Sequence, residues 1–304
     1  MVKLNIDIPD DFYQEEIRSG YKVTAETKKI WAVELDLLNE LLNVCKKHNI
    51  QIYSSSGTML GAVRHHGFIP WDNDVDMMMK REEYNKLCNI ASEEFHYPYF
   101  FQTEYTDPGS LRGHAQLRRS DTTGALSSEL NRKDINQGIF IDIFPHDVLP
   151  DDKNELENWK NQLRYDYLNA KFCNKNTRAF GKRNLISFAL SRNVKIPYIL
   201  HNGSKYWYQK FERDASMYSN TKGKYLGLVR MMIDSDAYDE CEPSKYYEDF
   251  VECPFEMLKV LVPAKTDEAL TAEYGNWKKF VIGGDYHGEI LFDADHGYKE
   301  LLKY

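Results

Sequence analysis

The sequence of 304 residues predicts an α+β protein, with strands and helices mixed in the first half and helices dominating the second. Two observations support this prediction. Apolar residues recur at helical spacing in several long segments, and short runs rich in Ile, Val, Phe and Tyr lie between turns that contain Gly, Pro or Asn. From Asp151 onward, helical segments rich in Lys, Asn and Tyr replace the strand-like runs. We therefore predict a core at residues 1–150 and a mainly helical region at 151–304.

The first long helix is predicted from Thr27 to His48, where apolar residues return every three or four positions. A short strand, Ile50 to Tyr53, is followed by a turn of small residues and by a second helix from Thr58 to Arg64. A strand from Val75 to Met79 and a helix from Arg81 to Phe95 complete this part. The pattern thus predicts strand, small-residue turn, helix and strand in this order.

The remaining elements follow from the same patterns. The expected strands are Leu4 to Pro9, Tyr97 to Thr103, Ala115 to Arg119, Gly138 to Phe144 and Met257 to Pro263. The expected helices are Lys153 to Phe172, Lys205 to Tyr218 and Thr266 to Tyr274. A polar segment, Asn174 to Lys182, joins the first two of these helices, and Gly275 ends the last one because glycine readily adopts the left-handed conformation.

Composition excludes several classes of protein. A formal net charge of −8 argues against a nucleic-acid backbone as the main partner, since such sites need a basic surface. The five cysteines are widely spaced and form no CxxC pair, which indicates neither a disulfide framework nor a zinc knuckle. No apolar run has the length of a signal peptide core or a transmembrane segment. We therefore expect a cytoplasmic protein, peripheral at the inner face of the membrane if it serves a surface polymer.

Three aspartates suggest a metal site. Asp74 and Asp76 flank Val75, so a strand here would turn both carboxylates to one face. Like charges this close repel unless a cation lies between them, which favours Mg²⁺, or Mn²⁺ in its place. Asp142 lies inside an apolar run and could be a third ligand or the acceptor of a proton. The structural alternatives are a solvated acidic turn and a hydrogen-bonded buried aspartate.

A turn of small residues before the second helix consists of Ser56, Gly57 and Thr58. Hydroxyl and N–H groups at a helix N-terminus can bind phosphate, although an ordinary N-cap is the alternative. Arg64 and His65 could neutralise phosphate charge, although Arg64 could also pair with an aspartate. Of the adjacent Arg118 and Arg119, we expect at least one to point to solvent, and we choose Arg118 as a further phosphate ligand.

Three segments together resemble a known family. The segment GTMLGAVRHHGFIPWDNDVDMMMKREEY resembles the signature of the LicD family of phosphocholine transferases. That signature has a Gly-Thr-Leu-Leu-Gly-Ala-hydrophobic-Arg run, then Gly-Phe-hydrophobic-Pro-Trp-Asp and an Asp-x-Asp. GIFIDIFPHD resembles the family's second motif and LVPAKTDEALTAEYGNW its C-terminal motif. The resemblance runs from Gly57 to about Trp277, and fukutin and its relatives share this core. Residues from Lys153 to Met257 match no pattern of the family.

The resemblance implies a nucleotidyltransferase-type fold, with a small mixed sheet flanked by helices. The site would combine the small-residue turn with Asp74, Asp76 and Asp142. The implied reaction is metal-dependent transfer of phosphocholine, or a related phospho-amino-alcohol, from a donor such as CDP-choline or CDP-ethanolamine, with release of CMP. The acceptor would be a hydroxyl group of a teichoic acid, lipopolysaccharide or capsule precursor, and residues 151–304 would bind it.

A quaternary ammonium group is attracted to aromatic faces, so Trp71, Tyr274 and Trp277 are candidate choline contacts, with core packing as the alternative. Two other functions remain open. The same carboxylates could serve a nucleotidyltransferase that moves an NMP group to a small molecule or sugar. A non-catalytic choline- or glycan-binding module is the third interpretation, and such a module would keep its function without Asp76.

Overall fold

The computed structural model describes residues 1–174, 196–234, 241–282 and 289–303. The chain forms two compact units that interleave along the sequence. Unit 1 comprises residues 1–102, 114–146 and 242–304, and unit 2 comprises residues 103–113 and 147–241. The predicted boundary near Pro150 lies close to the start of the longer part of unit 2. Residues 242–304, however, return to unit 1 instead of continuing the helical region.

Unit 1 is built around neighbouring strands in the order β3-β4-β8-β6-β5. The central strand β8 is parallel to β4 and antiparallel to β6, while β3 and β5 run antiparallel to β4 and β6. These strands are β3 (Tyr53–Ser54), β4 (Asp76–Lys80), β5 (Tyr99–Gln102), β6 (Ala115–Arg119) and β8 (Ile139–Val148). The mixed sheet and its helices confirm the predicted α+β class.

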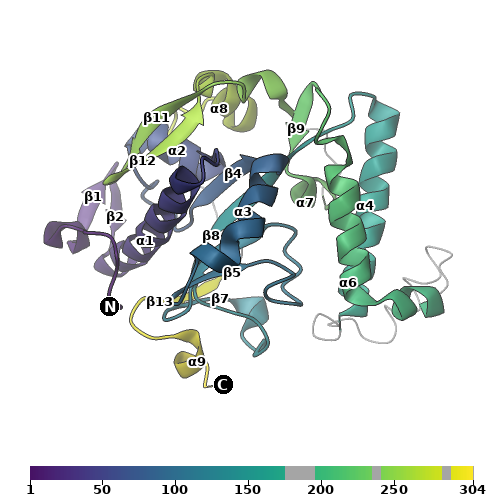
Figure 1. Ribbon diagram of the computed structural model, residues 1–304. Coiled ribbons are helices and arrows are strands. Elements are labelled where there is room, and N and C mark those ends of the chain that lie inside the picture. Colours follow the sequence, from purple (N-terminus) through teal and green to yellow (C-terminus); the bar gives the residue numbers. More distant parts are fainter. Residues whose placement is uncertain (175–195, 235–240, 283–288, 304) are drawn as a thin grey trace. The chain divides into compact units, whose positions relative to one another are not determined.

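One face of this sheet is apolar and packs against helices. Alternate residues along β4, β6 and β8 enter the main core, and these are Met77, Met79, Ala115, Leu117, Ile139, Ile141 and Ile143. Figure 1 shows α1 (Ala25–Lys47) and α3 (Arg81–Glu94) on the near side of the strands. Trp31, Leu35 and Leu38 bring the apolar side of α1 into the same core. Because side chains alternate along a strand, the residues between these positions face the opposite side.

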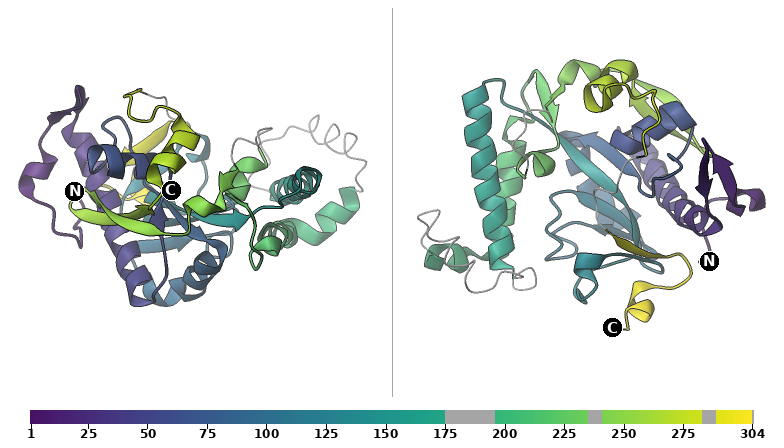
Figure 2. Two further views of the ribbon diagram at one scale, coloured as in Figure 1. Left: turned by 90° about the horizontal axis from the view of Figure 1, so that it is seen from above. Right: turned by 180° about the vertical axis from the view of Figure 1, so that it is seen from behind.

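The other elements of unit 1 are mostly hairpins and short helices. They are η1 (Asp10–Tyr13), β1 (Glu16–Arg18), β2 (Tyr21–Val23), α2 (Ser56–His65), β7 (Thr123–Leu126), η2 (Ser127–Glu129), β10 (Glu242–Pro243), η5 (Ser244–Tyr246), β11 (Phe250–Phe255), β12 (Leu258–Pro263), α8 (Thr266–Tyr274), β13 (Ile290–Asp293) and α9 (Tyr298–Leu301). Figures 1 and 2 show the lime-coloured β11–β12 hairpin beside α2. Gly275 ends α8 with a φ of 63°, as predicted.

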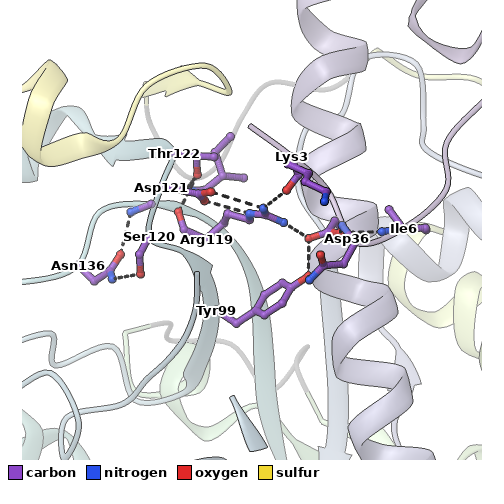
Figure 3. A network of polar contacts seen from close by, with 12 residues as sticks. Lys3, Ile6, Asp36, Tyr99, Arg119, Ser120, Asp121, Thr122 and Asn136 are labelled. Carbon is purple, nitrogen blue, oxygen red and sulfur yellow. Dashed lines mark hydrogen bonds and ion pairs between the residues drawn. The ribbon is translucent and has the colours of Figure 1, made fainter. Parts of the chain in front are cut away.

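A closed polar network ties α1 to β6 (Figure 3). The guanidinium of Arg119 forms an ion pair with Asp36, and both side chains are fully buried. Asp36 Oδ2 also accepts a hydrogen bond from the Tyr99 hydroxyl at 2.8 Å, and its Oδ1 accepts from the backbone N–H of Ile6 at 3.0 Å. The predicted strand at Leu4 to Pro9 is therefore wrong, since its N–H groups bond to a side chain on α1 and form no ladder.

Unit 2 contains a helix pair with its own core. It comprises α4 (Lys153–Cys173), α6 (Ile196–Ala215), η3 (Ser216–Tyr218), β9 (Tyr225–Gly227) and α7 (Val229–Met232), and the last two residues of β8 pair with β9. Leu163 and Tyr167 on α4 pack in one core with Trp207 and Phe211 on α6. Both predicted helices are thus confirmed, whereas the polar segment Asn174 to Lys182, apart from Asn174, lies outside the described residues. In the described part of the chain, no helix has the length and apolarity needed to cross a membrane.

Candidate active site

A row of polar side chains crosses the sheet on the face opposite α1 and α3. Asp76 on β4 pairs in register with Asp142 on β8, Asp142 pairs with Gln116 on β6, and Gln116 pairs with Gln102 on β5. Neighbouring strands lie about 4.8 Å apart, so side chains at paired positions on one face are adjacent. The alternation that buries Met77 against the helices turns Asp76 to this row.

Asp142 is buried, and two donors orient its carboxylate. Its Oδ1 accepts hydrogen bonds from His114 Nε2 at 2.9 Å and from Gln116 Nε2 at 2.7 Å. The amide oxygen of Gln116 accepts from Arg118, which turns the amide nitrogen towards Asp142. His114 and Gln116 were not among the predicted site residues. Gln116 could have been found as a polar residue at the alternating, outward position of a predicted strand, while His114 precedes that strand and gave no signal.

Arg118 and Arg119 are both buried, so the expectation that one would point to solvent is wrong. Each has acceptors inside the protein, which makes burial of the charge tolerable. Arg119 pairs with Asp36, and Arg118 donates to Gln102 Oε1 at 2.7 Å and to the Gly138 carbonyl at 2.8 Å. Arg118 therefore supports the polar row from within the sheet. Its role as a phosphate ligand stays a prediction.

The surroundings of Asp76 disfavour the charged form of its carboxylate. Its Oδ1 is buried and has no hydrogen-bond partner within the described residues. Burial raises the pKa of Asp76 well above its ordinary value, and the charges of Asp74, Asp142 and Asp72 raise it further. A buried carboxylate with an unpartnered oxygen and other carboxylates nearby has the donor chemistry that a hard divalent cation requires.

Asp74 lies in the loop before β4, because the strand begins only at Asp76. That Asp74 and Asp76 project to one face stays a prediction, although the charge of Asp74 does act on Asp76. Asp72 organises this loop, since its Oδ1 accepts from the backbone N–H of Asn73 at 3.1 Å and its carbonyl accepts from Trp31 Nε1 at 2.9 Å. Among the residues that the structure describes, no three His, Cys, Asp or Glu side chains form a group arranged to hold a metal ion. The fit to a cation therefore rests on the chemistry of Asp76 and its neighbours.

The small-residue turn opens α2 beside this acidic loop. Ser56 has a φ of 41°, in the left-handed region that is costly for residues other than glycine. A Cβ on Gly57 would lie 2.8 Å from Asp72 Oδ2, so a side chain at position 57 would displace that carboxylate. Thr58 Oγ1 accepts from the backbone N–H of Asp76 at 2.8 Å. Ser55, at the N-cap position, forms no side-chain capping bond, so the turn is not an ordinary N-cap.

Two glutamates join the acidic group, and the sequence pattern had singled out neither. Glu34 lies on the buried side of α1, and its pKa is raised well above the ordinary value by burial and then by Asp74 and Asp72. Its place on the apolar face of a predicted helix, three positions after Trp31, was a usable signal. Glu273 on α8 gave no such signal. It shares hydrogen bonds with Ser56 and Tyr274, and its charge contributes to the raised pKa of Asp76.

The remaining predicted residues form a second group. Arg64 donates to the Trp277 carbonyl at 2.8 Å, and the ring centroids of His65 and Trp71 are 6.2 Å apart. Burial, followed by the charge of Arg64, lowers the pKa of His65 to about 4, so this imidazole is neutral at pH 7. Tyr274, by contrast, is hydrogen-bonded to Glu273 of the acidic group, and burial, followed by the charges of Glu273 and Asp76, raises its pKa.

Two buried groups, Tyr53 and His146, lie beside the half-buried Glu242 near one end of the sheet. The Tyr53 hydroxyl contacts His146 Nδ1 at 3.0 Å, and His146 Nε2 lies 3.9 Å from Glu242 Oε1. Burial lowers the pKa of His146 to about 3. Burial, with a contribution from the charge of Glu273, raises the pKa of Glu242 to about 8. His146 follows Asp142 by four residues on β8, so both face the same side of the sheet.

The polar row and the small-residue turn lie in a segment that matches a known protein family. Residues 49–198 match the family model "LicD/FKTN/FKRP, nucleotidyltransferase domain". This range contains the turn, the acidic loop, β4, β6 and β8. The candidate site therefore lies within the residues that match this model.

Similar proteins agree with the domain match. The chain is 26% identical over 257 residues to the lipopolysaccharide cholinephosphotransferase LicD of Haemophilus influenzae. The aligned residues make up 81% of this chain and 88% of that protein. It is 39% identical over 70 residues to the uncharacterized protein RP689 of Rickettsia prowazekii, 23% of this chain and 24% of that protein. RT0683 of Rickettsia typhi is 43% identical over 47 residues, 16% of this chain and 15% of the relative. Residues 49–198 thus match the LicD family, and the chain is a phosphotransferase.

Proposed function

We propose that this protein transfers phosphocholine, or a related phospho-amino-alcohol, from a CDP-linked donor to a hydroxyl group of a cell-surface glycan precursor, with release of CMP. The observation that carries the proposal is the pair Asp76 and Asp142 on adjacent parallel strands, with Asp142 and the Oδ1 atom of Asp76 buried. The similarity to the Haemophilus cholinephosphotransferase supports the choline headgroup and a lipopolysaccharide-type acceptor. CDP-ethanolamine is the related donor.

The residues divide the chemical work between them. Asp74, Asp76 and Asp142 would hold Mg²⁺ or Mn²⁺, which supplies positive charge against the donor diphosphate. Backbone N–H groups of the turn and the hydroxyl of Ser56 would bind phosphate oxygens. His114 and Gln116 hold the Asp142 carboxylate in one orientation.

The transfer itself is a displacement at phosphorus. The acceptor hydroxyl oxygen forms a bond to the phosphorus that carries choline, and the bond from that phosphorus to the oxygen of CMP breaks. The hydroxyl proton passes to a carboxylate, for which Asp142 is our candidate. In this scheme three aromatic side chains would contact the choline group of the donor. Tyr274 and Trp277 belong to the C-terminal motif, and Trp71 belongs to the first motif.

A second candidate is nucleotidyl transfer, because the family's domain is a nucleotidyltransferase domain and the same carboxylates could serve the nucleoside phosphorus. The products distinguish the two reactions. Phosphocholine transfer leaves free CMP and adds choline phosphate to the acceptor, whereas nucleotidyl transfer adds CMP to the acceptor. Mass spectrometry of the acceptor therefore decides between them.

The test combines the protein with CDP-choline, Mg²⁺ and a glycan precursor fraction, and follows CMP release and acceptor mass. We expect CMP release that stops when EDTA removes the cation and resumes with excess Mg²⁺ or Mn²⁺. Asp76→Asn should abolish it, whereas Asp7→Asn, a matched change of an exposed aspartate, should not. Absence of CMP release from both CDP-choline and CDP-ethanolamine would contradict the proposal. If Asp76→Ala keeps the full function, the protein is a binding module instead.

A further inference from the structure

Three consecutive large apolar side chains are exposed in the segment after α8. The exposed fractions are 52% for Phe280, 62% for Val281 and 67% for Ile282. Scattered exposed apolar residues are common on soluble proteins, but adjacent ones create a continuous apolar surface that indicates an interaction site. We propose that residues 277–282, here called the interfacial loop, dock the protein on the surface of an anionic lipid bilayer.

The base of the interfacial loop is fixed to the helix that carries the candidate active site. The guanidinium of Arg64, near the end of α2, donates to the carbonyl oxygens of Trp277 at 2.8 Å and Lys279 at 3.4 Å. It also lies 5.0 Å from the centre of the Phe280 ring. α2 begins at the small-residue turn, so a surface that binds the loop would hold this turn at a set height above the lipid headgroups.

Aromatic side chains extend the apolar surface from the loop across unit 1. Ring centroids are 5.3 Å apart for Phe280 and His65, 6.2 Å for His65 and Trp71, and 5.8 Å for Trp71 and Tyr21. Tyr21 is 37% exposed, and Trp71 is half-buried. Tyr and Trp favour the region between water and acyl chains because each joins an apolar ring to a polar group.

The charges of the loop select an anionic surface. Lys278 and Lys279 directly precede the apolar triplet, although the formal net charge of the whole chain is −8. Lys278 pairs with Asp267 at 3.0 Å, but both side chains are largely exposed, so this pair is weak and can open. Apolar side chains next to lysines are the combination that binds a membrane interface, where each cation near anionic lipid adds to the affinity. A groove on a protein partner would need the apolar residues but not the two lysines.

The test measures co-sedimentation of the purified protein with vesicles and needs no donor, so it is independent of the proposed function. The vesicles contain phosphatidylcholine with about one third phosphatidylglycerol. Val281→Ser combined with Ile282→Ser should lower the partition coefficient about tenfold or more, since both side chains would leave the acyl boundary. Both are exposed in the protein, so the variant should melt at the wild-type temperature.

A matched control changes two exposed apolar residues of unit 2, Met217→Ser with Met231→Ser, and should leave the partition coefficient unchanged. Lys278→Gln with Lys279→Gln should lower it severalfold at low ionic strength, and this difference should vanish in high salt. Wild-type protein that stays in the supernatant would overturn the proposal. So would equal binding of the wild type and the Val281/Ile282 variant, or equal binding to pure phosphatidylcholine.

Discussion

Both faces of the central sheet bury charged side chains, but the carboxylate of Asp76 on one face lacks, among the described residues, the opposite charge that Asp36 has on the other. On the side of α1, Arg119 and Asp36 form an ion pair, and Asp121, Tyr99 and backbone groups bond to the same two side chains (Figure 3). On the other side, Asp76 lies near other carboxylates and has a buried oxygen that no described residue hydrogen-bonds. Buried charge is tolerated when paired and costly when it is not. The balanced network therefore stabilises the fold, and the unbalanced one has the donor chemistry of the proposed cation site.

We expect the largest effect on activity from Asp76→Asn. We expect the rate of CMP release to fall about a thousandfold or more, since the substitution removes the charge on which cation and diphosphate would depend. The same variant should unfold at a higher temperature than the wild type when no divalent cation is present, because repulsion with Asp74 and Asp142 is relieved. Differential scanning calorimetry with EDTA measures this. A variant that loses both activity and stability would mean that Asp76 is structural.

The balanced face should respond in the opposite way. Asp36→Ala removes the buried carboxylate that pairs with the Arg119 guanidinium and leaves it with Asp121, which should lower the free energy of unfolding by about 3–5 kcal/mol. Urea denaturation of unit 1, followed by Trp fluorescence, measures this change. Asp36→Leu combined with Arg119→Met should recover most of the loss, because no charge then stays buried. If the double variant is as unstable as Asp36→Ala, packing and not charge pairing is the function of this network.

The sequence was sufficient to predict the regular parts of the molecule and the most acidic part of the site. Helical periodicity located α1 and α4, and the run of apolar residues around Asp142 located β8, because one face or both faces of each element are buried. The family motifs contained the turn, Asp76 and Asp142. Hydrophobic periodicity and sequence motifs could not predict the contacts between segments that are far apart in the sequence. Residues 242–304 return to unit 1, and Glu273 thereby reaches Ser56, although neither fact has a local signature.

Two errors have the same physical origin. From the sequence, at least one of Arg118 and Arg119 was expected to point to solvent, because an unpaired charge is costly to bury. Their acceptors, Gln102 and Asp36, lie on other elements, and only the folded chain brings them together. The N-terminal segment read as a strand, yet its N–H groups bond to Asp36. A single buried carboxylate therefore explains both the hidden Arg119 and the missing strand.

Gln116→Leu tests whether the amide beside Asp142 contributes to activity. Gln116→Leu removes the donor to Asp142 Oδ1 and the acceptor for Arg118 while keeping a similar volume. We expect activity to fall by about ten- to a hundredfold, as is usual when a group that orients a ligand is lost. Gln102→Leu is the matched control, since it removes an amide that contacts Arg118 but not Asp142. Steady-state kinetics of both variants measure the effect, and equal losses would show that Gln116 acts only through Arg118.

We expect the smallest effect from Glu242, whose carboxylate lies 3.9 Å from His146, and this effect is a pH dependence of the free energy of unfolding. Because burial raises the folded-state pKa of Glu242 to about 8, the folded protein binds a proton that the unfolded chain has released above its ordinary pKa. The contribution of this group is thus fully present at low pH and is lost as the pH rises towards about 8. About a third of the side chain stays exposed, so the slope should be well below that of a whole proton. Urea denaturation from acid to alkaline pH should show a shallower decline for Glu242→Gln than for the wild type, and parallel curves would mean that Glu242 is ionised throughout.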